Sequence, residues 1–347
     1  MSSAPELSRN LLKEVSMKFR AFSSRTVAAT ATVALLVVTL VCAIAAFGQV
    51  SQKSKVPDPR TPDGQPDLQG IWNTSTVTPM ERPRDLEGKE FFASEAEASA
   101  YEKAATAKSE AGLNNGIGSY GDLYYEFGTK TVKTRRTSFI VDPPDGRVPP
   151  LTPTAQAAWE REQAIRRRRP NGPEDRPTSE QCVAIRTGVP PMTPWAYNSN
   201  YRIVQSKNQV AIYIEMIHDV RIIPLDGRPH LPSSIHLWYG DSVGHWEGNT
   251  LVVDTTNLSG KTGFYGADEN LHVIERFSRM DADTLLYQFT VDDPSAFTKI
   301  WKGELTMSAA PGPIVEYACN EGNYALAGIL GGARADDKAE EAARKAK

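Results

Sequence analysis

The stretch ERFSRMDADTLLYQFTV, residues 275–291, decides the fold of this chain. Apolar and polar side chains alternate on both sides of Asp281–Asp283, and this period of two is typical of a strand with one buried face. Aspartates between two such runs favour a tight reversal. The stretch therefore predicts a β-hairpin, which implies antiparallel pairing in this part of the chain.

Further extended runs lie on either side of this hairpin, separated by turn signals such as PPDG, SKN, PLDG and SGKTG. In WEGNTLVVDT, Gly248–Asn249 predicts a second tight reversal. The predicted extended segments are Tyr124–Phe127, Ser138–Asp142, Tyr201–Gln205, Val210–Ile223, Thr250–Thr256, Leu271–Arg279, Thr284–Asp292 and Ile314–Cys319. We predict an α+β fold, mainly antiparallel β, built as a lipocalin-like barrel or a strongly curved sheet with two peripheral helices.

The two helices are predicted near residues 94–109 and 153–169. Ser94 and Glu97 form a capping-box pattern before an alanine-rich run, and Pro153 suits a first helical turn. The second helix ends in four arginines, Arg166–Arg169. Cations at a helix C-terminus stabilise the helix dipole, and no interleaved aromatic residues follow, so we expect no nucleic-acid partner.

The N-terminal region indicates export. Residues 27–47 carry no charge and follow Lys18, Arg20 and Arg25, which is the pattern of a signal peptide. We predict a signal peptide at 1–48, with an uncleaved anchor as the alternative and the only membrane contact. A Pro-rich linker at 49–66, one β-rich domain at 67–335 and a charged tail at 336–347 follow. The predicted location is periplasmic or secreted.

Export changes the interpretation of the cysteines. Cys42 lies within the predicted signal, which leaves Cys182 and Cys319 in an oxidising compartment. We predict a disulfide between them, with two separate buried thiols as the alternative.

Strand alternation predicts which side chains face inward. Along Val210–Ile223 one face is apolar except for His218, and along Leu271–Arg279 the more apolar face contains Glu275. Because an unpaired buried polar group costs about 1–3 kcal/mol, each should have a partner. We predict that His218 and Glu275 share an enclosed pocket, as an acid–base pair if the protein is an enzyme.

Other polar residues of the same strands and loops are candidate ligand contacts: Arg221, His230, Asp241, Ser242, His272 and Glu316. Asp241 and Ser242 lie in GDSVG, which lacks the strand–turn–helix setting of an esterase elbow, so a loop at the pocket rim is expected. All five histidines lie between His218 and His272. Their spacings match no standard zinc signature, so no cofactor is predicted, and a protein-bound divalent metal is the alternative.

Long motif blocks carry a family resemblance. The runs MIHDVRIIPLDGRPH, WYGDSVGHWEGNTLVVDTTN, ENLHVIERFSRMDADTLLYQFTVDDP and EYACNEGNYALAGIL resemble a family of exported bacterial proteins without an assigned activity. The resemblance implies a signal peptide and a β-rich body. In addition, Gly70–Trp72 is similar to the opening of lipocalin-like barrels, in which the tryptophan plugs one end.

Three functions are consistent with the sequence. The first is binding of a small, largely apolar molecule in a barrel pocket, and the second is an enzyme of lyase or hydrolase type that uses His218 and Glu275 in the same pocket. The third is a structural, envelope-associated protein whose core is filled by its own side chains. A filled or an empty interior distinguishes the third function from the others.

Overall fold

The structure is a computed structural model that describes residues 59–113, 126 and 128–346. The predicted signal peptide and most of the linker lie outside the described residues, as does nearly all of the segment predicted at Tyr124–Phe127. The chain divides into two units after Pro57, and the described residues all belong to the second unit.

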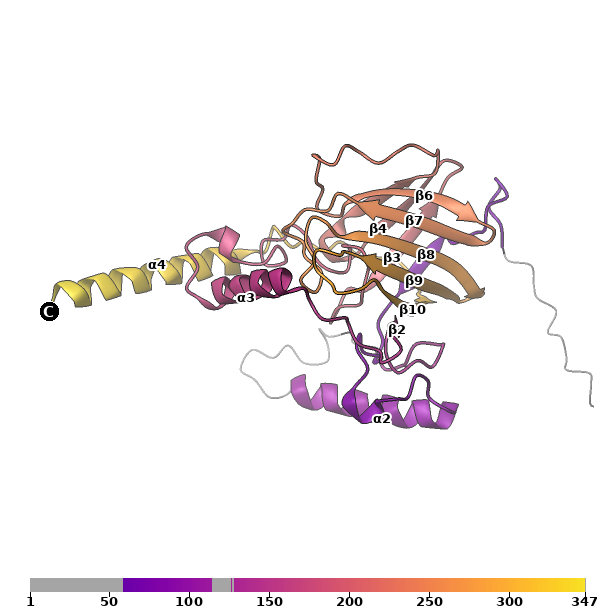
Figure 1. Ribbon diagram of the computed structural model, residues 1–347, viewed down its shortest axis with the longest axis horizontal. Helices are drawn as coiled ribbons and strands as arrows, with labels where there is room; N and C mark the ends of the chain where they lie inside the picture. Colours follow the sequence, from indigo (N-terminus) through magenta and orange to yellow (C-terminus); the bar gives the residue numbers. More distant parts are fainter. Residues whose placement is uncertain (1–58, 114–125, 127, 347) are drawn as a thin grey trace, which may run out of the picture. The chain divides into compact units, whose positions relative to one another are not determined.

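The described residues form one ten-stranded antiparallel sheet, in which nine strands follow the order β5-β4-β3-β1-β10-β9-β8-β7-β6 and β2 pairs with β10 (Figure 1). The strands are β1 Gly70–Asn73, β2 Ile140–Asp142, β3 Asn200–Gln205, β4 Gln209–Ile214, β5 Val220–Pro224, β6 Asp241–Glu247, β7 Thr250–Thr256, β8 His272–Asp281, β9 Thr284–Asp292 and β10 Trp301–Ala309. The sheet curls into a nearly closed barrel, which confirms the predicted fold class.

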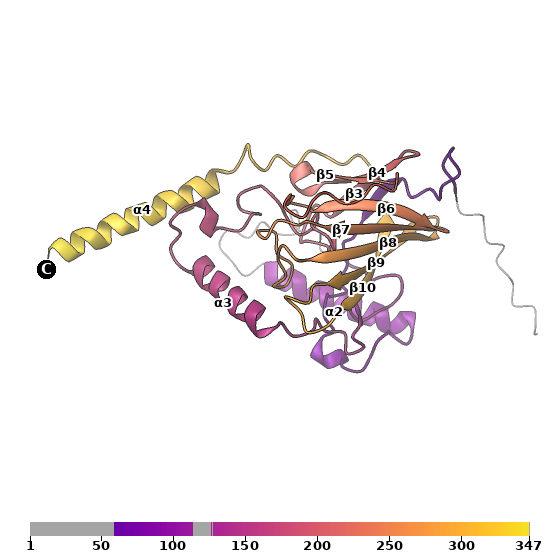
Figure 2. The same ribbon diagram turned by 45° about the horizontal axis from the view of Figure 1, so that its top comes forward.

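The two ends of the strand order, β5 and β6, approach each other at the seam of the barrel. Gly244 of β6 makes this approach feasible, because a Cβ atom there would lie only 2.8 Å from Ile223 and 2.9 Å from Leu225. Seen from a second direction, β3, β4 and β5 pack across from β7 to β10 (Figure 2). A seam without a continuous hydrogen-bonded ladder needs side chains to hold it closed.

Both hairpins predicted from turn chemistry are present. β8 pairs with β9 through Asp281 and Thr284, and β6 pairs with β7 up to Glu247 and Thr250. The inward face of β8 is the predicted one, since Val273, Glu275 and Phe277 are all at most 1 % exposed. Local alternation and turn residues were therefore sufficient for these elements.

Two strand predictions were wrong, and two strands were not predicted. The segment 210–223 forms two strands, because the chain reverses direction at Glu215–Asp219, where Ile217 and His218 have positive φ angles of 64° and 46°. The segment 314–319 forms no strand. β10 was not predicted, nor was β6, which lies where we expected a loop. In β10, Gly303 packs so closely on the Phe289 ring that a Cβ would lie 2.2 Å from it, and such a strand has weak alternation.

Within the described residues, three α-helices accompany the barrel: α2 Glu95–Leu113, α3 Pro153–Arg167 and α4 Tyr324–Lys345. The first two confirm the predicted helices. Ser94 accepts a hydrogen bond from the Glu97 backbone N–H at the start of α2, and Thr152 caps α3 through the Ala155 N–H. α4 begins before the predicted tail and runs through it. None of the helices in the described ranges is long and apolar enough to cross a bilayer.

Three of the four arginines in the run Arg166–Arg169 form ion pairs. Arg166 contacts Glu162 within α3, and Arg168 contacts Asp175. Arg169 reaches α4, where it contacts Asp337 at 2.8 Å and Glu340 at 2.6 Å. The run therefore ties α3 to its own neighbours and to α4.

Large side chains fill the interior of the barrel. Those that are at most 2 % exposed include Trp72, Tyr201, Phe277, Tyr287, Phe289 and Trp301. The Pro-rich segment 187–192 packs against them, because Tyr201 donates to the Thr187 carbonyl and Met192 N–H donates to the Tyr287 hydroxyl, both at 2.8 Å. Trp72 is buried, and its indole N–H donates to the Leu68 carbonyl.

Candidate functional site

One group of predicted site residues meets inside the barrel at the seam. Arg221 of β5 donates two hydrogen bonds to Glu275 of β8, at 3.0 and 2.5 Å, in the bidentate geometry that a guanidinium and a carboxylate favour. It also donates to Ser242 of β6 at 3.1 Å and to Thr255 of β7 at 3.3 Å. One side chain of β5 therefore bonds to three strands on the other side of the seam.

The electrostatics of this group are those of a closed ion pair. The side chains of Arg221 and Glu275 are 2 % and 0 % exposed. Burial lowers the pKa of Arg221, but the Glu275 carboxylate outweighs it, so the pKa lies above its ordinary value. Tyr287 donates to Glu275 at 2.7 Å, and burial with the adjacent carboxylate raises its pKa. These groups pair with one another, with the Arg221 Nε as the one buried donor of the guanidinium without a partner in the described residues, and they hold the barrel shut.

His218 does not belong to this group, so the predicted pairing of His218 with Glu275 was wrong. The imidazole is exposed, and its Nδ1 lies 2.8 Å from the carbonyl oxygen of Tyr317. The reversal at Glu215–Asp219 changes strand parity, so that Arg221 and Ile223 face inward while Val220 and Ile222 face outward. Arg221 is thus the partner that Glu275 required.

A second group lies on the outer face of the barrel and brings together three other predicted residues. His230, in the loop between β5 and β6, contacts Asp241 through Nδ1 at 2.8 Å and Asp254 through Nε2 at 3.2 Å. His272 of β8 contacts the same Asp254 oxygen at 2.9 Å. The Leu231 N–H also donates to Asp241. This cluster fastens the β5–β6 loop onto β6 and β7.

The cluster predicts a pH-dependent contribution to stability. The Asp254 hydrogen bond raises the pKa of His272 above its ordinary 6.5, and His272 in turn lowers the pKa of Asp254 below its ordinary 3.8. Because folding raises the pKa of His272, this group stabilises the fold at pH values below 6.5, and the contribution is lost as the pH rises through its pKa in the folded protein. Because folding lowers the pKa of Asp254, this group stabilises the fold at pH values above 3.8, and the contribution is lost as the pH falls through its pKa in the folded protein. The pair therefore stabilises the fold most between these limits.

We expect His272→Gln to lower the free energy of unfolding by about 0.5 kcal/mol near pH 5.5 and by less near pH 9. The size is small because the two side chains are 32 % and 37 % exposed, so water screens the pair. Urea unfolding followed by tryptophan fluorescence measures it. In an Asp254→Asn background the same substitution should show no such pH dependence, and an equal pH dependence there would contradict the assignment.

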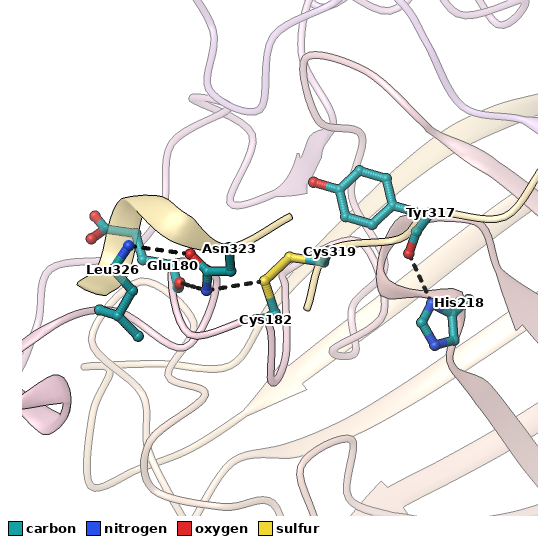
Figure 3. The surroundings of a disulfide bond; sticks show 7 residues. All are labelled: Glu180, Cys182, His218, Tyr317, Cys319, Asn323 and Leu326. Atoms are coloured by element: carbon teal, nitrogen blue, oxygen red, sulfur yellow. Dashed lines mark hydrogen bonds between the residues drawn. A yellow bond between two sulfur atoms is a disulfide. The ribbon is translucent and has the colours of Figure 1, made fainter. Parts of the chain in front are cut away.

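A third group surrounds the predicted disulfide, which is confirmed: Cys182 and Cys319 are bonded, with their Cα atoms 5.7 Å apart. Figure 3 shows the bond beside Asn323, which donates to the Glu180 carbonyl at 2.8 Å, and close to the contact of His218 with Tyr317. Glu316 is exposed in the same segment and contributes nothing to the barrel interior. These contacts hold the chain between β10 and α4 against the segment around Cys182.

An open cavity lies outside the barrel interior, beside α3. It has a volume of about 400 Å³, and three segments line it: one face of α3, the loop around residues 177–195, and the loop 260–268. Arg186 lies over two aromatic rings, with its guanidinium carbon 5.6 Å from the centre of Trp195 and 5.5 Å from that of Tyr265. We call this cavity the α3 pocket.

Local structure explains how the pocket displays Tyr265. Phe264 and Ala267 exchange backbone hydrogen bonds of 3.2 and 3.1 Å, which closes a tight turn. Phe264 is buried and stacks on Trp301, whereas Tyr265 lies at the tip with a positive φ of 53°. A non-glycine residue in this conformation is uncommon and occurs more often at functional sites.

The sequence did not reveal the α3 pocket. It also did not reveal Asp254 as the partner of His230 and His272, or Thr255 and Tyr287 as partners of the Arg221–Glu275 pair. The available signals were the turn-rich run SGKTGFYGAD and the Pro-rich run GVPPMTPW, each of which carries an aromatic residue in a loop. Such loops are where binding residues concentrate, but nothing in either run shows that the two meet.

Two further findings bear on function. Within residues 59–346 and outside their masked gaps, no group of three or more His, Cys, Asp or Glu side chains is arranged to hold a metal ion. In comparisons with known proteins, no family model and no curated protein matches this chain.

Proposed function

We propose that this protein is an exported binding protein for a small molecule, and that the α3 pocket holds the ligand. The observation that carries the proposal is Arg186, which lies between Trp195 and Tyr265 at the wall of a cavity of about 400 Å³. Binding sites for small molecules are concave and combine apolar or aromatic walls with a few placed polar groups. The disulfide supports a periplasmic or secreted location, where such proteins operate.

The aromatic lining supports the same proposal. Trp159 of α3, Trp195 and Tyr265 are 39 %, 37 % and 39 % exposed, although each is a large apolar side chain. Three such rings around one cavity form a surface that a ligand can cover. The proposed site differs from the predicted one, because side chains and segment 187–192 fill the barrel interior.

That filled interior favours a second candidate, a structural protein of the cell envelope. The Arg221–Glu275 pair and the aromatic core leave the barrel as a packed body, so the barrel itself needs no ligand to be stable. The two candidates differ in one respect: only a binding protein takes up a molecule at the α3 pocket.

Native mass spectrometry of the full chain, exported by and purified from a bacterial host, tests the proposal. We expect an added mass that Trp159→Ala removes, because this exposed side chain lines the pocket. The matched control is Tyr324→Ala at the start of α4, an aromatic that is 82 % exposed and outside the pocket. If the wild type carries no ligand and no compound of a metabolite panel raises its melting temperature, the structural candidate stands instead.

A further inference from the structure

We propose that the ligand of the α3 pocket is a planar aromatic carboxylate, with its carboxylate on Arg186. This inference rests on the proposed function and names the chemical class that the pocket would select. Three observations carry it: the charges of the lining, the unused hydrogen-bonding capacity of the Arg186 guanidinium, and the exposed aromatic rings.

The charges of the lining favour an anion. Three cations and two carboxylates line the pocket: Arg166, Arg186, Lys261, Glu162 and Asp268. Glu162 is already bonded to Arg166, and Asp268 accepts hydrogen bonds from Asn270. Arg186 and Lys261 form no ion pair with a carboxylate in the described part of the chain. A bound anion would supply that partner.

The Arg186 side chain has unused hydrogen-bonding capacity. Nη2 makes one long contact of 3.4 Å with the Tyr265 hydroxyl, and Nη1 makes no hydrogen bond with the described residues, so both terminal groups can donate to a ligand. A guanidinium offers parallel N–H donors that match the two oxygens of a carboxylate. The two flanking rings restrict the orientation of Arg186, which lowers the entropic cost of forming that pair.

The rings and the volume favour a flat molecule. Arg186 already covers the faces of Trp195 and Tyr265, which leaves Trp159 of α3 as the ring of the lining for the ligand to contact. A cavity of about 400 Å³ is near the lower end of the usual range for small-molecule sites. A molecule of one or two rings is therefore the expected size.

Isothermal titration calorimetry of the full chain tests this ligand class. The four probes are indole-3-carboxylate, its neutral amide, cyclohexanecarboxylate and inorganic phosphate. We expect the aromatic acid to bind about tenfold more tightly than its neutral amide, since only the acid forms a charge-assisted pair with Arg186. It should also bind more tightly than cyclohexanecarboxylate and phosphate, because neither offers an aromatic ring to Trp159. Arg186→Gln should remove the preference for acid over amide, and Trp159→Ala should remove that for the planar ring. The control Arg161→Gln, an exposed α3 arginine outside the lining, should change neither.

The outcomes separate the two proposals. Equal affinity for acid and amide, tighter binding of phosphate, or a preference for the acid that persists in Arg186→Gln would overturn the assigned class. Binding of the neutral amide that Trp159→Ala weakens would still support a small-molecule site in this pocket. If none of the four probes binds, the class is wrong, and the native mass measurement decides the proposed function independently.

Discussion

Glu275→Gln is expected to lower the free energy of unfolding by about 3–5 kcal/mol, the largest effect of any single substitution considered for this protein. The substitution keeps the shape of the side chain and its capacity to accept from Tyr287, but it leaves the Arg221 guanidinium charged and 2 % exposed. A buried charge without a counter-charge is costly because water can no longer solvate it. Domains are stable by only about 5–15 kcal/mol, so much of the total would be lost.

Urea unfolding followed by tryptophan fluorescence measures this loss. The matched control is Arg276→Gln, the next residue on β8, which points outward and contacts Glu247 at 2.8 Å with 38 % and 50 % exposure. A surface pair of that kind contributes at most about 1 kcal/mol. Equal destabilisation by the two substitutions would show that the buried pair does not hold the seam.

A double replacement separates the cost of an unpaired charge from the value of the pair itself. Apolar residues of similar volume often substitute for a buried ion pair without loss of stability. We therefore expect Arg221→Met with Glu275→Leu to recover most of the stability that Glu275→Gln removes. A double variant as unstable as the single one would mean that the hydrogen bonds to Ser242 and Thr255 are also essential.

Loss of the Cys182–Cys319 disulfide is expected to have the second largest effect. The bond joins residues 137 positions apart, and the chain-entropy model assigns a loop of that length about 5 kcal/mol, of which about 2–5 is usually observed. Neither cysteine lies in a strand, so the loss should fall first on the chain between β10 and α4. The remaining contacts there include those of Tyr317 with His218 and Tyr197 and that of Asn323 with Glu180.

The measurement compares wild type with a variant that carries both Cys182→Ala and Cys319→Ala. We expect a lower melting temperature and proteolytic cleavage between β10 and α4 that precedes cleavage of the barrel. Adding a thiol reductant should convert the wild type to the same behaviour and leave the variant unchanged. Identical melting temperatures and cleavage patterns in all samples would contradict a stabilising role of the bond.

The sequence by itself determined the elements whose signal is local. The β8–β9 hairpin, the inward position of Glu275, the starts of α2 and α3 and the disulfide all follow from alternation, turn residues, caps and cysteine number. These features depend on neighbours within a few residues or, for the disulfide, on the pair of cysteines that remains when Cys42 is assigned to the predicted signal.

Tertiary structure alone decided which polar groups meet. A period of two can be continued through the run 215–219, since Met216 stays in phase with Ile214 and Val220, while positive φ angles at Ile217 and His218 reverse the chain there. That reversal sends His218 to solvent and Arg221 to Glu275 across the seam. The α3 pocket likewise joins three segments distant in sequence. The physical reason is that side-chain direction follows from backbone path and barrel closure, and neither is encoded in the hydrophobic pattern of one strand.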